Sequence, residues 1–106
     1  MTRSKEGLAE MIDEYRKQYI DIKAVLGRVA ARDGPSTQWR VDLNACEATW
    51  DLMTVNFYVT AEGEFCPNSY SRLDGRDLET EQDCLLLEDS YACIAEAIAE
   101  RKRKSN

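Results

Sequence analysis

The chain has 106 residues, of which 43% are apolar and 32% charged, and its net charge is −6. This length predicts a single domain, residues 1–106, with one modest core. The charge is unevenly distributed, because residues 42–100 hold fourteen acidic and two basic side chains, whereas residues 1–41 and 101–104 are net positive. Such an acidic field repels nucleic acid and anionic membranes and attracts basic surfaces, so direct binding to nucleic acid or membrane is not expected.

The sequence shows no targeting or membrane segment. No basic start precedes an apolar run, and no apolar run approaches the roughly 20 residues that a membrane-spanning helix needs. We therefore expect a cytoplasmic protein.

The thiols do not form a metal-binding motif. There is no histidine and no Cys-x-x-Cys pair, so a zinc site would need all four scattered cysteines, which are Cys46, Cys66, Cys84 and Cys93. We expect no metal and no cofactor, with the thiols reduced and acting as small apolar groups. A Cys46–Cys66 disulfide is the alternative for a secreted protein.

The first predicted element is a helix over residues 5–32. Ser4 is its candidate N-cap, and Gly34-Pro35 is expected to stop it. Spacings of alternately four and three residues separate the apolar side chains of one stripe, which are Leu8, Ile12, Tyr15, Tyr19, Ile22, Leu26 and Val29.

Two strands are predicted next, at residues 37–43 and 52–60. In both segments apolar and polar residues alternate, as is typical of half-buried antiparallel strands. Residues 44–49 are predicted as a loop. Gly63 suits a tight turn, after which residues 64–66 are the candidate third strand. Residues 67–77 are predicted as the longest loop.

A second helix is predicted over residues 78–102, with Asp77 or Thr80 as its N-cap. Its apolar stripe consists of Cys84, Leu87, Tyr91, Ile94 and Ile98. The predicted fold class is therefore α+β, with a long N-terminal helix, a two- or three-stranded antiparallel β-meander and a long C-terminal helix. The helices pack on one face of the sheet or on each other, and the same stripes suit a homodimer as well as a monomer.

No group of residues indicates catalysis. A loop starting at Asp42 begins like a calcium site, but Cys46, Glu47 and Met53 occupy positions that require an oxygen ligand, a glycine and a glutamate. Asp74 and Asp77 are paired carboxylates in a polar loop, where capping and turn formation are the common roles. Without histidine, a thiol or hydroxyl nucleophile lacks its usual base. We predict that the protein is not an enzyme.

Carboxylates beside aromatic residues are the candidate partner-binding groups. Spaced carboxylates imitate phosphates and attract basic partners, and exposed aromatic side chains make good anchors. Trp50 and Tyr58 are expected on the strand face opposite the apolar residues of the 52–60 strand, either exposed or beneath a helix. The predicted partner-binding residues are Asp89, Glu96 and Glu100 on one exposed side of the second helix, together with Glu47, Asp51, Glu62, Glu64, Trp50 and Tyr58.

The predicted function is a non-catalytic acidic protein that blocks or mimics a nucleic-acid-binding or other basic surface on a protein partner. Small phage inhibitors of bacterial defence (anti-CRISPR-like proteins) and toxin-immunity proteins share this size, charge and lack of catalytic residues, an analogy of type rather than of sequence. The alternatives are a dimeric adaptor or secretion-chaperone-like protein, and a small enzyme with a carboxylate-based site. The basic residues 101–104 suit a solvated helix end, a nucleic-acid contact or targeting signal, or docking onto a second copy.

Overall fold

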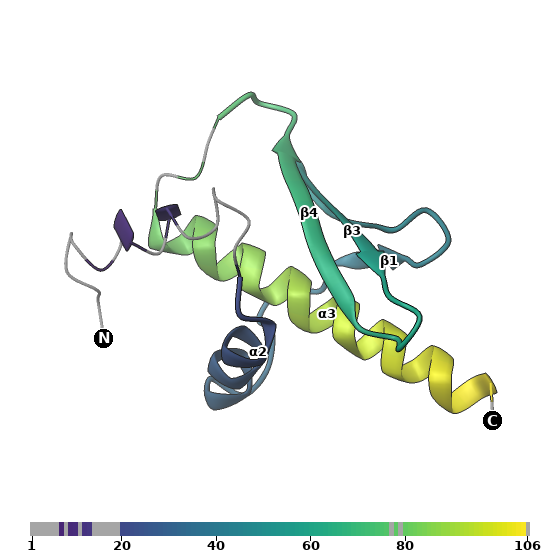
Figure 1. Ribbon diagram of the computed structural model, residues 1–106. Helices are drawn as coiled ribbons and strands as arrows, with labels where there is room; N and C mark the ends of the chain where they lie inside the picture. Colours follow the sequence, from purple (N-terminus) through teal and green to yellow (C-terminus); the bar gives the residue numbers. More distant parts are fainter. Residues whose placement is uncertain are drawn as a thin grey trace.

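The computed structural model describes residues 7, 9, 10, 12, 13, 20–76, 78 and 80–105 (Figure 1). Residues 7, 9, 10, 12 and 13 are helical. The following elements are α2 (Ile22–Ala31), β1 (Arg40–Asp42), β2 (Glu47–Trp50), β3 (Met53–Val59), β4 (Phe65–Arg72) and α3 (Glu81–Ser105). The strands form one antiparallel meander in the order β1-β2-β3-β4, which confirms the predicted α+β class.

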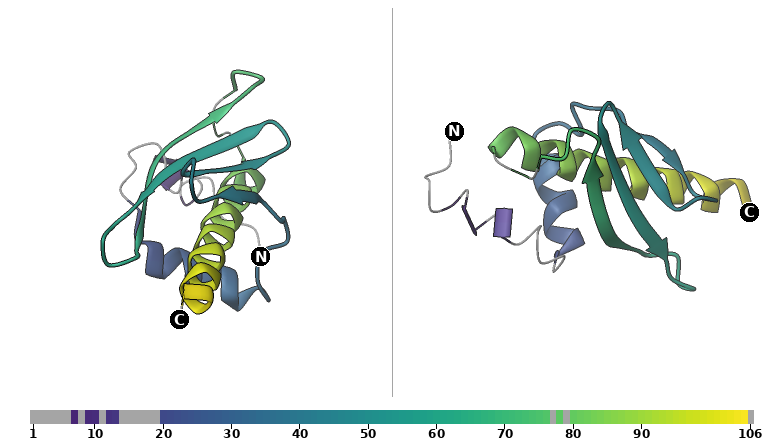
Figure 2. Two further views of the ribbon diagram at one scale, coloured as in Figure 1. Left: turned by 90° about the vertical axis from the view of Figure 1, so that its right-hand side faces the viewer. Right: turned by 90° about the horizontal axis from the view of Figure 1, so that it is seen from above.

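Helix α3 is the central layer of the fold. The sheet lies along one side of α3, and α2 crosses it on the other side (Figures 1 and 2). The second face of the sheet has no described helix over it, so it is the open face. None of the helices in the described part of the chain is long and apolar enough to cross a membrane.

Helix α2 begins later than the apolar spacing predicts. Asp21 is its N-cap, with an extended backbone and a side chain that accepts a hydrogen bond from the Ala24 N–H at 3.2 Å. The predicted continuous helix over residues 5–32 is therefore wrong at residues 20–21, because an aspartate that caps a free N–H starts a new helix. Ser4, Leu8, Tyr15 and Tyr19 lie outside the described residues.

The end of α2 agrees with the prediction. Gly34 takes a positive φ of 93°, and its N–H donates to the Val29 carbonyl at 2.9 Å. This bond back into the last turn is the usual way in which a helix end satisfies a free carbonyl.

The sheet has four strands, where two or three were predicted. The 52–60 strand is confirmed as β3, and the 37–43 strand is confirmed as the shorter β1. Strand β2 begins inside the predicted loop 44–49 and ends at Trp50, and it lies between two residues with positive φ, Cys46 and Asp51. Because neither is glycine, the sequence carries no strong turn signal on either side of β2.

Strand β4 continues through the first half of the predicted loop 67–77. Its central residues Pro67, Asn68 and Ser69 are poor strand formers, but β4 is an edge strand, where proline is tolerated. Asn68 has no partner in the register with β3, so it forms a bulge between Pro67 and Ser69. Pairing with the β3 backbone therefore extends β4 where the residues themselves do not favour it.

Helix α3 begins with a reciprocal cap. The Thr80 hydroxyl accepts from the Asp83 N–H at 3.1 Å, and the Asp83 carboxylate accepts from the Thr80 N–H at 3.1 Å. Thr80 is thus the N-cap, one of the two predicted residues. The predicted stripe is confirmed, since Cys84, Leu87, Tyr91, Ile94 and Ile98 are all buried. The Tyr91 ring packs near the Phe65 ring of β4, with 6.1 Å between the ring centroids. This contact packs α3 against the sheet.

Candidate partner-binding site

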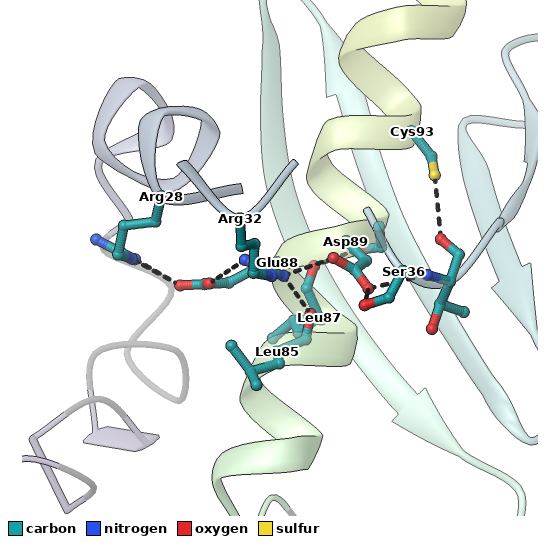
Figure 3. Close-up of polar contacts among 10 residues, drawn as sticks. Arg28, Arg32, Ser36, Leu85, Leu87, Glu88, Asp89 and Cys93 are labelled. Carbon is teal, nitrogen blue, oxygen red and sulfur yellow. Dashed lines mark hydrogen bonds and ion pairs between the residues drawn. The ribbon is translucent and has the colours of Figure 1, made fainter. Parts of the chain in front are cut away.

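The carboxylates of α3 nearest to α2 are buried in an ion-pair cluster (Figure 3). Glu88 and Asp89 are each 1% exposed. Glu88 accepts from Arg28 at 2.7 Å and from Arg32 at 3.3 Å. Arg32 also bonds Asp89, whose second oxygen accepts from the Thr37 N–H at 3.1 Å and the Ser36 hydroxyl at 3.4 Å. Both carboxylates therefore serve to hold α2 and the following segment on α3.

The prediction that Asp89 is part of an exposed acidic surface is wrong. It lies on the side of α3 that α2 covers, and its oxygens are taken by partners within the chain. Apolar periodicity did not predict this second buried side of α3, because arginine–carboxylate pairs line it rather than an apolar stripe. Arg28, Arg32 and Glu88 were not among the predicted functional residues; the available signal was two arginines four residues apart near the end of α2.

Glu96 and Glu100 are exposed, as predicted, but they are not free charges. Their side chains are 69% and 53% exposed, and Arg103 contacts both, at 3.2 and 3.3 Å. Lys104 lies 3.7 Å from Glu100. The basic residues at the end of α3 therefore neutralise much of the acidic charge one and two turns earlier.

The carboxylates of the sheet form a different group. Asp42, Glu47, Asp51, Glu62 and Glu64 make no ion pair with any residue that the structure describes. Four of them lie at the end of the sheet where β3 finishes, in or beside the β1–β2 and β3–β4 turns. We call Asp42, Glu47, Glu62 and Glu64 the sheet-end carboxylates. Asp51 lies at the opposite end, in the β2–β3 turn.

Two turns fix the positions of these carboxylates. The Asp42 side chain accepts from the N–H groups of Asn44 and Ala45, both at 3.0 Å, which is a turn-forming role rather than a calcium-binding one. Gly63 has a φ of 85°, a left-handed backbone conformation that residues with a side chain rarely adopt, and the flexible end of the Lys102 side chain lies beside it. The β3–β4 turn that carries Glu62 and Glu64 therefore depends on glycine.

Tyr58 lies on the open face of the sheet. It is 56% exposed and pairs with Cys66 across β3 and β4. A hydrogen bond with the Cys66 side chain is the main cause that raises the pKa of the Tyr58 phenol, so the phenol stays neutral near pH 7. An exposed aromatic ring with a polar tip, close to unpaired carboxylates, is a common kind of interface anchor.

Trp50 does not share that face, contrary to the prediction. It pairs with Met53, whose side chain faces the core, and its ring lies 6.4 Å from that of buried Trp39. Directly paired residues of antiparallel strands share a face. The error arose because β2 was not predicted as a strand, so its alternation could not be aligned with β3.

The remaining candidates have structural roles. Asp74 accepts from the Arg76 N–H at 3.1 Å and from Arg72, and Arg72 also bonds Asp83 of α3. Asp77 lies outside the described residues. Among the described residues, no group of three or more cysteine or acidic side chains is placed to hold a metal ion.

The cysteines are all free thiols, and Cys84 is fully buried. Cys46 lies on the β2 side of β3, where its carbonyl accepts from the Phe57 N–H, while Cys66 lies on the β4 side. Two strand spacings put these residues roughly 10 Å apart, beyond the approximately 7 Å limit for a disulfide. The Cys46–Cys66 alternative is therefore excluded in this fold.

Comparison of the chain with protein-family models, curated proteins and solved structures gives no match.

Proposed function

We propose that the protein is a non-catalytic binding protein whose sheet-end carboxylates and Tyr58 occupy a basic surface on a protein partner. A surface that normally binds nucleic acid is the favoured target, because carboxylates spaced across the end of the sheet can replace phosphates. An inhibitor of a defence or toxin protein would work in this way, without cofactor or turnover.

The observation that carries the proposal is the division of the acidic side chains. Five carboxylates of α3 are paired with arginine or lysine, whereas the sheet-end carboxylates have no ionic partner in the described residues; the five are Asp83, Glu88, Asp89, Glu96 and Glu100. Unpaired carboxylates set up an acidic field that can steer a basic partner at long range. The open face of the sheet also leaves Tyr58 accessible beside that field.

The test compares two double charge reversals. Glu62→Lys with Glu64→Lys alters the sheet end, and Glu96→Lys with Glu100→Lys alters α3 by the same charge at equally exposed positions. Tagged wild-type protein captures partners from a lysate of the source organism at low salt, and mass spectrometry identifies them. The two variants are then compared for the amount of the same partner that they retain.

We expect the sheet-end variant to lose the partner at least tenfold and the α3 variant to retain most of it. The reverse result would move the site to Glu96 and Glu100. If both variants retain as much partner as the wild type, neither acidic surface makes the contact. Circular dichroism and the melting temperature of each variant show that the fold is intact.

A groove favours the adaptor as the second candidate. A space of about 460 Å³ between α2, β4 and α3 has mainly apolar walls, formed by Ile22, Leu26, Phe65, Ala95, Ile98 and Ala99. Lys23, Glu64 and Lys102 also line it. A hydrophobic segment of a partner, or a second copy in a homodimer, is what such a groove would hold.

A further inference from the structure

The open face of the sheet places an aromatic ring beside an unpaired carboxylate. Glu47 of β2 pairs with Asn56 of β3, and Tyr58 follows two residues later on the same face of β3. Diagonal neighbours of this kind lie roughly 7–8 Å apart in antiparallel sheets, within reach of long side chains. Tyr58 is 56% exposed, so a group from another molecule can reach both its ring and Glu47.

The Tyr58 ring is held from the side away from Glu47. Its phenol shares a hydrogen bond with the side chain of Cys66, its direct partner on β4. Because β3 lies between β2 and β4, this bond restricts the ring without using the side that faces β2. A side chain that is already ordered loses less conformational freedom when a partner binds.

The same face carries further hydrogen-bond acceptors near Glu47. Asp42 is the direct partner of Glu47 across β1 and β2, and neither carboxylate has an ion pair with a described residue. Like charges directly opposite each other are unfavourable, so this pair favours a bound cation. Asn56 donates to the Ser69 hydroxyl at 3.5 Å, which leaves its amide oxygen as an acceptor.

The combination of a ring and a carboxylate selects one kind of cation. An arginine guanidinium is planar and weakly hydrated, so its face can stack on an aromatic ring while its N–H groups bond a carboxylate. A lysine ammonium is compact and strongly hydrated, and it cannot make both contacts in this way. Carboxylates alone would accept either cation, whereas Tyr58 and Glu47 together favour arginine.

We propose that the protein partner presents an arginine to the open face, where the guanidinium stacks on Tyr58 and bonds Glu47, with Asp42 and Asn56 as further acceptors. This inference rests on the proposed binding of a basic surface and names the group that is recognised. Nucleic-acid-binding surfaces use arginine to bond phosphates and to stack on bases. A tyrosine ring beside a carboxylate offers such an arginine the same two contacts.

The test titrates the protein with two peptides that carry one positive charge each, acetyl-Gly-Arg-Gly-amide and acetyl-Gly-Lys-Gly-amide. Nuclear magnetic resonance follows the backbone and side-chain amide signals of Asn56, which stays the same in every variant. We expect the arginine peptide to shift these signals saturably. The lysine peptide should bind about fivefold more weakly, because it lacks the stacking contact.

Three variants assign the preference to the two groups. In Tyr58→Leu, which removes the ring, both peptides should bind equally weakly. Glu47→Gln removes the charge and should weaken binding of the arginine peptide by about fivefold. Asp51→Asn is the control, because it removes an unpaired carboxylate at the opposite end of the sheet, and it should bind both peptides like the wild type. Circular dichroism and the melting temperature show that each variant is folded.

The inference fails if the lysine peptide binds as well as the arginine peptide, or if neither peptide shifts the Asn56 signals saturably. It also fails if Tyr58→Leu keeps the preference for arginine. The proposed function is decided separately, by partner capture. If Glu62→Lys with Glu64→Lys loses the captured partner while the wild type binds both peptides equally, the partner is basic but the arginine contact is wrong.

Discussion

Arg32 connects α2 to α3 through several groups at once. It bonds Glu88 and Asp89 and also donates to the Leu85 carbonyl at 3.2 Å (Figure 3). The two carboxylates are buried, so they depend on the arginines in place of water. Such a pair adds little stability over an apolar replacement, but it is costly to break.

Arg32→Ala should therefore lower the free energy of unfolding by about 3 kcal/mol, because it leaves Asp89 buried without its cation. The estimate is at the low end for buried pairs because the Arg32 side chain is 26% exposed, so water can partly replace it. Arg103→Ala is the control, with an expected cost below about 0.5 kcal/mol for an exposed pair. Urea unfolding measures both variants, and equal costs would contradict the importance of burial.

Asp74 links stability to pH. The Arg76 N–H and the Arg72 guanidinium lower the pKa of the Asp74 carboxyl below its ordinary value. A carboxyl whose pKa is lower in the folded state stabilises the protein above its unfolded pKa and loses this contribution as the pH falls toward its folded pKa. Asp74→Asn should therefore be less stable than wild type at pH 7. The difference in stability between wild type and Asp74→Asn should become smaller below about pH 5, as the wild-type carboxylate protonates.

Thermal unfolding of both proteins across this pH range checks the prediction. A stability difference that stays constant with pH would show that Asp74 acts through its shape and hydrogen bonds rather than through its charge.

At the scale of elements, α3 organises the fold because it is buried on two sides. One side carries the apolar stripe against the sheet, and the other carries Glu88 and Asp89 against α2. The sheet gains its stability from this helix, since a small meander without a packed face is marginal in water.

Ile94→Ala should lower the free energy of unfolding by about 2–5 kcal/mol, because Ile94 is fully buried at the centre of the stripe. Leu73→Ala removes an aliphatic side chain that is 85% exposed, and it should change stability by less than about 0.5 kcal/mol. Denaturant unfolding compares the two. A cost for Ile94→Ala as small as that for Leu73→Ala would mean that α3 packs through another face.

At the scale of the whole molecule, charge is separated between the helices and the sheet. Within the described part of the chain, five carboxylates of α3 have basic partners, whereas four of the five unpaired sheet carboxylates lie together at one end of the sheet. The apolar groove between α2, β4 and α3 borders this end of the sheet, because Gly63 and Glu64 also line it. An electrostatic contact through the sheet-end carboxylates and an apolar contact in the groove would thus use adjoining surfaces, which share Glu64.

The salt dependence of partner affinity distinguishes the two candidate functions. If the sheet-end carboxylates make the contact, partner affinity should fall at least tenfold between low and physiological ionic strength, because salt screens exposed charges beyond about 8–10 Å. Binding in the apolar groove should change little. Calorimetric titration of the captured partner at several salt concentrations gives the dependence, and salt-independent binding would favour the adaptor.

Local signals in the sequence predicted part of this structure. The stripe of α3, its Thr80 cap and the stop at Gly34-Pro35 depend on residues within one or two turns, so periodicity and capping were sufficient to find them. The alternation of β3 identified its buried face for the same reason. For Tyr58 the sequence left two alternatives, exposed or beneath a helix. Alternation identifies the face of the strand on which a residue lies, but not whether another element covers that face.

Only the tertiary structure decided the rest. Strands β2 and β4 owe their extent to backbone pairing with β3, and Trp50 faces the core because of the register that this pairing sets. Asp89 is buried because α2, more than fifty residues earlier, supplies its cation. The sequence by itself determined the total acidity and the local helix and strand signals. Contacts between distant residues determined which of the described carboxylates are buried, paired or unpaired, because burial and ion pairing depend on what lies opposite each side chain.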